Sequence, residues 1–193
     1  MVTYAPLPLT SEQRSTLISS ALSARDGSYS PYSKFRVGAC MLKEDGGFVK
    51  GANVECASYG GAICAERTAI VKAVSEGTKK FIGLAVTSLS SSFLHTLCPS
   101  DRELTNICLT ESSDVPAIIS PCGICRQLLR EFCPLDMPIL LVPSNYEEGV
   151  TKVVKVGDVE GKGTEGVLVE TTMGELLPLS FGPEDLDKPR DRS

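Results

Sequence analysis

The sequence predicts an α/β fold, in which a mixed five-stranded sheet is the central layer of a three-layer α/β/α arrangement. A helical segment comes first, two strand-like segments joined by a short turn follow it, and helical and strand-like segments then alternate along the chain. The length of 193 residues suits one domain with a substantial core. No repeat or linker marks a second domain, so we predict a single domain over residues 1–193.

The first part of the chain predicts a helix followed by a hairpin. The stretch TSEQ at 10–13 is a capping-box pattern, and the apolar residues behind it form one face of a helix that ends near 26–27. Strands are predicted at about 35–42 and 48–55. The glycine-containing turn EDGG lies between them and favours their pairing as a hairpin.

The rest of the chain is predicted to alternate helices with buried strands. Gly77 ends the first of these helices and Pro121 opens the second. Continuous apolar runs, typical of buried strands, accompany them. The predicted elements are a helix at 62–76, a strand at 81–87, a helix at 122–132, strands at 138–142 and 166–172, and a short helical turn at 174–177.

Two stretches fit this layout poorly. Residues 88–116 are rich in Ser and Thr and lack periodicity, whereas residues 144–164 are charged and contain glycine, with VTKVVKV readable as an extra hairpin. Loops of this length are uncommon inside compact domains. We therefore predict that both stretches are surface insertions.

Composition argues against several classes of partner. The net charge of −5 and the pI near 5.0 offer no positive field for nucleic acid or a membrane surface. No window approaches the roughly 18 apolar residues that a membrane helix requires. Pro6 and Pro8 interrupt the N-terminal stretch, and no apolar signal-peptide core follows them. The sequence therefore predicts a cytosolic protein.

Three of the eight cysteines stand out by their spacing. Cys122 and Cys125 lie three residues apart at a predicted helix start, hence on one face and within reach of one metal ion. Cys64 starts the other helix, where backbone N–H groups also lower thiol pKa values. Three thiolates leave a tetrahedral zinc ion with one open position, which is typical of a catalytic site. The remaining five are scattered singly and read as core or loop residues: Cys40, Cys56, Cys98, Cys108 and Cys133.

Other interpretations of these cysteines stay open at this point. The pattern C-x-x-C alone is also typical of a redox pair or half of a structural zinc site. A closed structural site needs a fourth ligand, and the only histidine, His95, lies in the irregular stretch at 88–116. Glu66 favours catalysis, because it could take a proton from water in the open position. The alternative for Glu66 is a first-turn acid that the helix dipole favours.

Two arginines lie close to the cysteines in sequence. Three thiolates on Zn²⁺ leave one excess negative charge, which weakens the ion as a Lewis acid. A guanidinium that donates to a thiolate offsets part of this charge. Arg67 and Arg126 are the candidates, with surface ion pairs as the alternative.

These motifs closely resemble those of the zinc-dependent nucleoside deaminases, specifically the small homotetrameric cytidine deaminases. The resemblance rests first on CAERTAI at 64–70 and PCGICRQLLREF at 121–132. Three more blocks resemble the family in the same order: PYSKFRVGA at 31–39, GANVE at 51–55 and ELLPLSFGPEDL at 175–186. Gly60-Gly61 departs from the family pattern, as do the two insertions.

The resemblance implies a role for each matching residue. It implies zinc ligation, with one ion per subunit, by Cys64, Cys122 and Cys125, and proton transfer by Glu66. It also implies hydrogen bonds of Asn53 and Glu55 with the sugar hydroxyl. Phe35 is implied to pack on the pyrimidine ring, and the backbone of Ala65 to contact the base. Tyr59 and Phe181 are implied to complete the pocket of a neighbouring subunit.

The reaction implied is hydrolytic deamination of cytidine and deoxycytidine to uridine and deoxyuridine plus ammonia, within pyrimidine salvage. The implied assembly is a homotetramer with shared active sites. Alternatives are a deaminase of a nucleoside-like antibiotic, a polynucleotide cytosine deaminase and a non-enzymatic zinc or redox protein. Polynucleotide deaminases usually have a histidine as first ligand and a basic channel, and the cysteine at 64 and the negative net charge disfavour that alternative.

Overall fold

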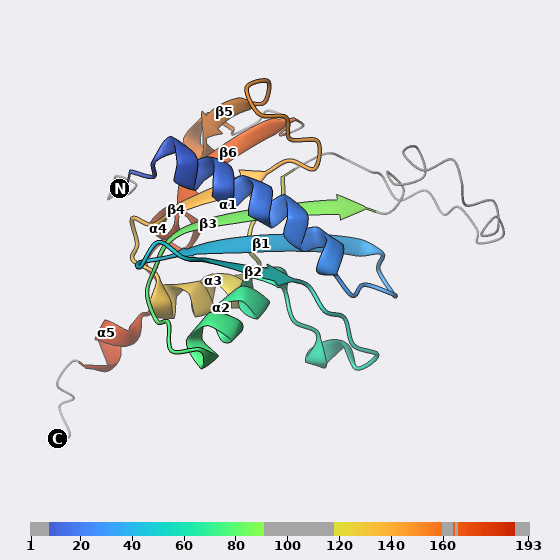
Figure 1. The fold of residues 1–193 in the computed structure, drawn as a ribbon. Coiled ribbons are helices and arrows are strands. Elements are labelled where there is room, and N and C mark those ends of the chain that lie inside the picture. The colour runs from blue at the N-terminus through green and yellow to red at the C-terminus, as the bar shows by residue number, and fades with distance from the viewer. Residues whose placement is uncertain (1–7, 91–117, 160–163, 165, 188–193) are drawn as a thin grey trace, which may run out of the picture.

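The computed structural model describes residues 8–90, 118–159, 164 and 166–187. This part of the chain contains a six-stranded sheet with the strand order β2-β1-β3-β4-β6-β5 (Figure 1). Strand β1 is antiparallel to β2 and β3, β3 and β4 are parallel, β4 and β6 are antiparallel, and β5 and β6 are parallel. The strands are β1 (Phe35–Lys43), β2 (Phe48–Ala52), β3 (Phe81–Ser90), β4 (Pro138–Val142), β5 (Lys152–Lys155) and β6 (Val167–Thr172).

Helices cover both faces of the sheet. Helix α1 lies across one face, and α2 and α3 lie side by side on the other (Figure 1). The predicted three-layer α/β/α arrangement is therefore confirmed. No helix in the described ranges is long and apolar enough to cross a membrane. The helices are α1 (Ser11–Ala24), α2 (Ala65–Ser75), α3 (Gly123–Phe132), α4 (Met173–Leu176) and α5 (Pro183–Leu186), with 3-10 turns η1 (Arg25–Gly27), η2 (Tyr59–Gly61) and η4 (Val156–Asp158).

The core consists of two apolar layers, one on each face of the sheet, because successive side chains of a strand point to opposite faces. In β1, Ala39 and Met41 point into the layer beneath α2 and α3, whereas Cys40 and Leu42 point into the layer beneath α1. Strand β4 is buried over its whole length and alternates in the same way. Both faces of the central strands are covered, which explains why these strands read as continuous apolar runs.

The predicted strand count of five was wrong, because the sheet has six strands. The additional strand, β5, lies within the predicted insertion at 144–164 and pairs in parallel with β6 rather than as a hairpin. It is a short edge strand whose side chains are mostly exposed, so it lacks the apolar run that reveals a buried strand. Lys155 also forms an ion pair with Glu170 of β6, at 2.9 Å.

Several predicted boundaries shift by a few residues. Strand β2 ends at Ala52 rather than 55, because the chain leaves the sheet there, and α2 begins at Ala65 rather than 62. Helix α5 was not predicted. Strand β3 continues to Ser90, so its last three residues belong to the predicted insertion at 88–116. The rest of that insertion lies outside the described residues, as does His95.

The start of α2 packs very closely on β2 at Gly51. A Cβ atom on Gly51 would lie 2.3 Å from the carbonyl oxygen of Ala65 and 2.5 Å from the backbone nitrogen of Ala69. Both atoms belong to the backbone of α2, so they cannot turn aside as a side chain can. The absence of a side chain at Gly51 therefore seats α2, and with it Cys64, against the sheet.

Replacing Gly51 by alanine is expected to destabilise the protein by about 1–3 kcal/mol, because overpacking must push α2 away from β2. Gly60→Ala is the matched control, since a Cβ there meets nothing within 4 Å. Urea unfolding followed by circular dichroism measures both variants. Equal unfolding midpoints for Gly51→Ala and Gly60→Ala would show that the close contact does not constrain α2.

Candidate functional site

Two helices begin with a cysteine at the N-cap position. Cys64 precedes α2 and Cys122 precedes α3, and neither side chain makes a capping hydrogen bond. Ser, Thr, Asp and Asn are the usual N-cap residues, because their oxygen atoms accept from the free N–H groups of the first turn. At both helix starts a sulfur atom stands where this oxygen acceptor is usual. The positive ends of both helix dipoles favour an anionic thiolate there.

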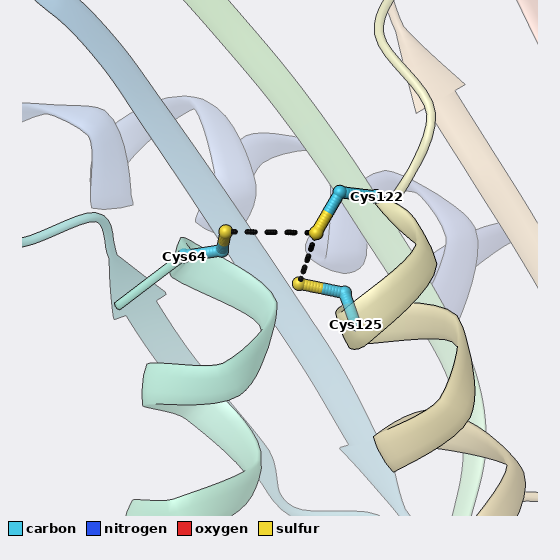
Figure 2. A group of neighbouring side chains, drawn as sticks. All are labelled: Cys64, Cys122 and Cys125. Atoms are coloured by element: carbon cyan, nitrogen blue, oxygen red, sulfur yellow. Dashed lines mark hydrogen bonds between the residues drawn. The ribbon is translucent and has the colours of Figure 1, made fainter. Parts of the chain in front are cut away.

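The three predicted ligands come together between α2 and α3 (Figure 2). The Sγ atoms of Cys64 and Cys122 lie 3.9 Å apart and those of Cys122 and Cys125 3.4 Å apart, and all three lie within 4.8 Å of one another. Zn–S bonds of about 2.3 Å in a tetrahedral site place sulfur atoms about 3.8 Å apart. The donor set and its spacing therefore fit a zinc ion.

The thiols in this cluster differ in acidity. Hydrogen bonding with Cys125 lowers the pKa of Cys64 to about 6, with further help from Cys122 and the positive charge of Arg67. Hydrogen bonding with Cys64 and burial raise the pKa of Cys125. One thiolate therefore forms readily at neutral pH, which suits metal binding, since a ligating cysteine must lose its proton.

Glu66 lies in the first turn of α2, beneath the cluster. Its side chain is buried, with 4% of the residue exposed. Burial raises the pKa of the Glu66 carboxyl, and negative charge at Cys64 adds to this effect, while Cys125 and Arg67 oppose it. A buried carboxyl with a raised pKa holds a proton more readily than an exposed one, which suits proton transfer.

The two predicted charge-balancing arginines have different surroundings. Arg67 donates to the carbonyl oxygen of Ala62 at 3.3 Å, and its charge lowers the pKa of Cys64. Arg126 donates to Pro121 O, Leu176 O and Ser120 Oγ at 2.7–2.8 Å. These contacts brace the segment before α3 against the C-terminal part of the chain. Charge balance by Arg126 stays a prediction.

A cavity of about 400 Å³ opens beside the cysteines. Its size lies within the range of small-molecule sites. Six of the predicted site residues line it: Phe35, Asn53, Glu55, Cys64, Glu66 and Cys122. Ala65 is buried and lies in the chain between two of them. The structure therefore brings two of the three predicted metal ligands and the predicted sugar-binding residues to one space.

The segment after β2 connects the two sides of this cavity. Val54 bridges to Ile63 through a reciprocal pair of backbone hydrogen bonds of 2.9 and 3.0 Å, and Ile63 immediately precedes Cys64. On its other side, the segment pairs with Tyr29 through hydrogen bonds to Asn53 and Glu55. The backbone therefore fixes the two polar residues relative to the metal ligands.

Ser33 is a site residue that sequence reasoning missed. The Glu55 carboxylate accepts hydrogen bonds from the hydroxyl and the backbone N–H of Ser33. It also accepts one from the backbone N–H of Tyr32, at 2.9 Å. The hydrogen bond from the Ser33 hydroxyl is the main cause of the lowered pKa of Glu55, to which the backbone donors add. Ser33 lies within PYSKFRVGA, but nothing in that block alone indicates its partner, which lies 22 residues away.

Tyr59 and Phe181 do not line this cavity. Tyr59 is 78% exposed, borders an adjacent hollow with Glu55 and forms an edge-to-face contact with Tyr32. Phe181 is 56% exposed, and its carbonyl oxygen accepts from Gln127 of α3 at 3.0 Å. Both aromatic rings therefore lie on the surface of the chain.

Comparison with known proteins agrees with this geometry. Residues 11–140 match the family described as the cytidine and deoxycytidylate deaminase zinc-binding region. A cytidine deaminase of Halalkalibacterium halodurans is 36% identical over 90% of this chain and 98% of its own length. The crystal structure of cytidine deaminase from Burkholderia pseudomallei matches 90% of this chain and all of that chain, at 29% identity and a TM-score of 0.59. A blasticidin-S deaminase of Bacillus cereus is less similar, at 27% identity over 77% of this chain and 78% of its own length.

The matched region contains all three clustered cysteines and Glu66, and the relatives cover nearly the whole chain. The protein therefore belongs to the cytidine and deoxycytidylate deaminase family.

Proposed function

We propose that this protein catalyses the hydrolytic deamination of cytidine and deoxycytidine, which yields uridine or deoxyuridine and ammonia. The observation that carries the proposal is the composition of the 400 Å³ cavity. Cys64, Cys122 and Glu66 supply a metal site and a proton carrier on one side. Asn53 and Glu55 supply polar groups suited to a sugar hydroxyl on the other. A nucleoside has both the ring to be hydrolysed and the sugar to be held.

In this proposal, Cys64, Cys122 and Cys125 hold one zinc ion per subunit. When bound, the ion lowers the pKa of a water molecule towards about 7, which makes a nucleophile available at neutral pH. Arg67 offsets part of the negative charge of the thiolates, as its effect on the pKa of Cys64 indicates. Arg126 is assigned the same role from α3, in addition to the contacts that brace the segment before the helix.

Glu66 moves the protons of the reaction. Its carboxylate accepts a proton from the attacking water and delivers it to N3 of the cytosine ring, which makes C4 more electrophilic. The same carboxylate then takes the proton of the new C4 hydroxyl and passes it to the amine, which departs as ammonia while C4 becomes a carbonyl. Its place on the cavity wall beside Cys64 supports this role, and its burial leaves little of the side chain in contact with bulk solvent.

The substrate is held at its base and at its sugar. Phe35 packs on the pyrimidine ring, and the backbone of Ala65 contacts the amide edge of the base. A sugar hydroxyl donates to the Glu55 carboxylate, which is an acceptor only when ionised, and accepts from the Asn53 amide. The hydrogen bonds of Ser33 and Tyr32 to Glu55 support this role, because they keep that carboxyl ionised.

A panel of substrates tests the proposed function. Zinc-loaded protein is incubated separately with cytidine, deoxycytidine, cytidine monophosphate, single-stranded DNA and blasticidin S, and products are separated by chromatography. We expect turnover of the two nucleosides, in keeping with a role in cytoplasmic pyrimidine salvage. Consumption of blasticidin S or DNA without consumption of either nucleoside would overturn the proposal in favour of another deaminase class.

We assign the active form to a homotetramer in which subunits share cavities. Tyr59 and Phe181 are exposed in the single chain and lie outside its cavity, which supports a role for them at a neighbouring subunit. The backbone around Phe181 is anchored to α3 by Gln127, and by Arg130 through Ser180 at 3.0 Å. An anchored segment that exposes an aromatic ring suits an interface.

Mixed oligomers test this sharing. Phe181→Ala removes the aromatic ring, and Glu66→Gln removes the proton carrier. Co-expression of the two variants with different tags, followed by tandem purification, yields oligomers that contain both. We expect these mixed oligomers to bind cytidine with a lower KM than Phe181→Ala alone, because intact cavities then receive Phe181 from a neighbour. An unchanged KM in the mixed oligomers would contradict shared sites.

A further inference from the structure

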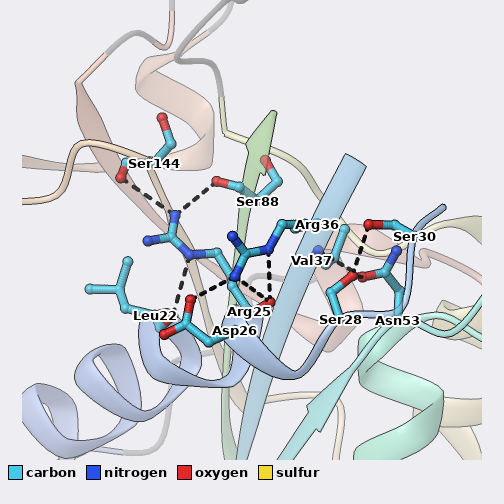
Figure 3. Close-up of polar contacts among 10 residues, drawn as sticks. All are labelled: Leu22, Arg25, Asp26, Ser28, Ser30, Arg36, Val37, Asn53, Ser88 and Ser144. Carbon is cyan, nitrogen blue, oxygen red and sulfur yellow. Dashed lines mark hydrogen bonds and ion pairs between the residues drawn. The ribbon is translucent and has the colours of Figure 1, made fainter. Parts of the chain in front are cut away.

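The side-chain amide of Asn53 is held by three hydrogen bonds from the protein itself. Its Oδ1 atom accepts from the hydroxyl of Ser28 at 2.6 Å and from the backbone N–H of Val37 at 2.8 Å (Figure 3). Its Nδ2 atom donates to the carbonyl oxygen of Phe35 at 2.9 Å. The amide therefore spans the end of β2, the start of β1 and the loop after η1.

These contacts determine how the amide can meet a ligand. An amide oxygen has two acceptor lone pairs, and Ser28 and Val37 provide one donor for each. The amide nitrogen carries two hydrogens, and Phe35 accepts one of them. The group that remains for a ligand is the second N–H. Asn53 can therefore act towards the cavity as a hydrogen-bond donor.

The position of Ser28 is itself fixed by a network of polar contacts. Its backbone N–H donates to the carbonyl oxygen of Arg25 at 3.0 Å, and the guanidinium of Arg36 donates to the same oxygen and to Asp26 at 2.6 Å. Arg25 in turn donates to the carbonyl oxygen of Ser88 at 3.1 Å (Figure 3). The loop after η1 is thus tied to the ends of β1 and β3, which holds the Ser28 hydroxyl against Asn53.

We propose that Ser28 is a positioning residue for substrate binding, which together with Val37 and Phe35 holds the Asn53 amide firmly in the orientation that presents an N–H donor to a sugar hydroxyl. The inference rests on the proposed function, since it requires a substrate with a sugar. Without the Ser28 hydroxyl, the amide keeps its contacts with Val37 and Phe35 but loses one of its three hydrogen bonds, so its N–H donor is held less firmly towards the cavity.

The polarity of this arrangement defines the ligand group. Glu55 lines the same cavity and, with its carboxyl ionised, can only accept a hydrogen bond. Asn53, held by Ser28, offers a donor. A hydroxyl group accepts one hydrogen bond and donates another, so it satisfies both residues at once. A ligand without a hydroxyl at this place cannot satisfy both residues through one group, and the binding of a nucleoside that lacks it is expected to be insensitive to Ser28.

Steady-state kinetics of Ser28→Ala test the proposal. We expect the KM for cytidine to rise about five-fold, which corresponds to the net contribution of roughly one hydrogen bond, with kcat within about two-fold of wild type. For 2′,3′-dideoxycytidine, which lacks the 2′- and 3′-hydroxyls of the sugar and keeps only the 5′-hydroxyl, we expect the same kcat/KM for variant and wild type. Ser28→Thr retains a hydroxyl and is expected to restore the KM for cytidine. Ser30→Ala is the matched control. It removes the neighbouring hydroxyl, which contacts Ser28 at 3.3 Å, but leaves the hydroxyl of Ser28 itself in place.

A double-mutant cycle separates positioning from a general loss of structure. If Ser28 acts through Asn53, adding Ser28→Ala to Asn53→Ala has no further effect on the KM for cytidine. An unchanged KM in Ser28→Ala, an equal loss for cytidine and the dideoxy analogue, or additive effects in the cycle would each overturn the inference while the proposed function stands. Absence of cytidine turnover by the wild-type protein would instead overturn the proposed function, and the role of Ser28 with it.

Discussion

Replacing Glu66 by glutamine is expected to lower kcat for cytidine by about 10²- to 10⁴-fold, the range that general acid–base catalysis contributes. The amide is nearly the same size as the carboxyl and can still form hydrogen bonds, but it cannot carry a proton between the water, N3 and the amine. Zinc content and the KM for cytidine are expected to stay near wild type, because Glu66 lies beside the cysteine ligands rather than among them.

The glutamine variant is also expected to fold at least as stably as wild type when metal is absent. Burial raises the pKa of Glu66 in the folded chain above its unfolded value. Ionised Glu66 therefore disfavours the folded state, and stability is lost as the pH rises through the raised pKa. The neutral amide removes this loss at pH 7, so inactivity of the variant cannot be attributed to unfolding. Thermal unfolding of chelator-treated protein measures the difference.

Glu76→Gln is the matched control for this variant. Glu76 lies at the other end of α2 and is exposed, so the same chemical change there is expected to leave kcat unaltered. Zinc is measured by atomic absorption on the same samples used for kinetics. Turnover by Glu66→Gln within a few-fold of wild type, with zinc present, would contradict the proton-transfer role.

Replacing Cys125 by alanine is expected to abolish stoichiometric zinc binding and to reduce deamination below detection. Cys125 is fully buried in the first turn of α3, and its loss leaves two thiols of the cluster. Wild-type stability is expected to fall on addition of a chelator, because a ligand that binds only the folded state stabilises it by mass action. The melting temperature of Cys125→Ala is expected not to respond to zinc or chelator.

Cys133→Ala provides a closely matched control. Cys133 is also buried, at the C-terminal end of the same helix, but it is not part of the cluster. Both variants remove one buried thiol, so both incur a packing cost, but only Cys125→Ala is expected to lose the metal. Equal zinc content in the two variants would show that the three cysteines are not the metal site.

Part of the arrangement around the cysteine cluster follows from short-range spacing in the sequence. Cys122 and Cys125 are three residues apart in sequence. Cys64 and Glu66 are two residues apart, which places Cys64 at the N-cap of α2 and Glu66 in its first turn. Such relations follow from helix geometry alone. The pairing of the two helix starts is a long-range contact, and the family resemblance rather than any periodicity predicted it.

The residues that the sequence did not reveal depend on contacts between distant segments. Ser28 and Asn53 are 25 residues apart, and neither periodicity nor a local motif indicates that their side chains meet. Strand β5 was interpreted as part of a possible extra hairpin in an insertion rather than as a strand of the main sheet, because an exposed edge strand need not be apolar. The early end of β2 depends on the bridge from Val54 to Ile63, which only the folded chain forms.

The most direct test of the central claim is simultaneous measurement of zinc, uridine and ammonia during incubation with cytidine. Wild-type protein, the same protein after removal of zinc, and the same protein after zinc is restored are compared. We predict that uridine and ammonia appear in equal amounts, that both are lost with zinc and that both return when zinc is restored. Equal formation of uridine by protein with and without zinc, or no uridine from zinc-loaded protein, would contradict the account.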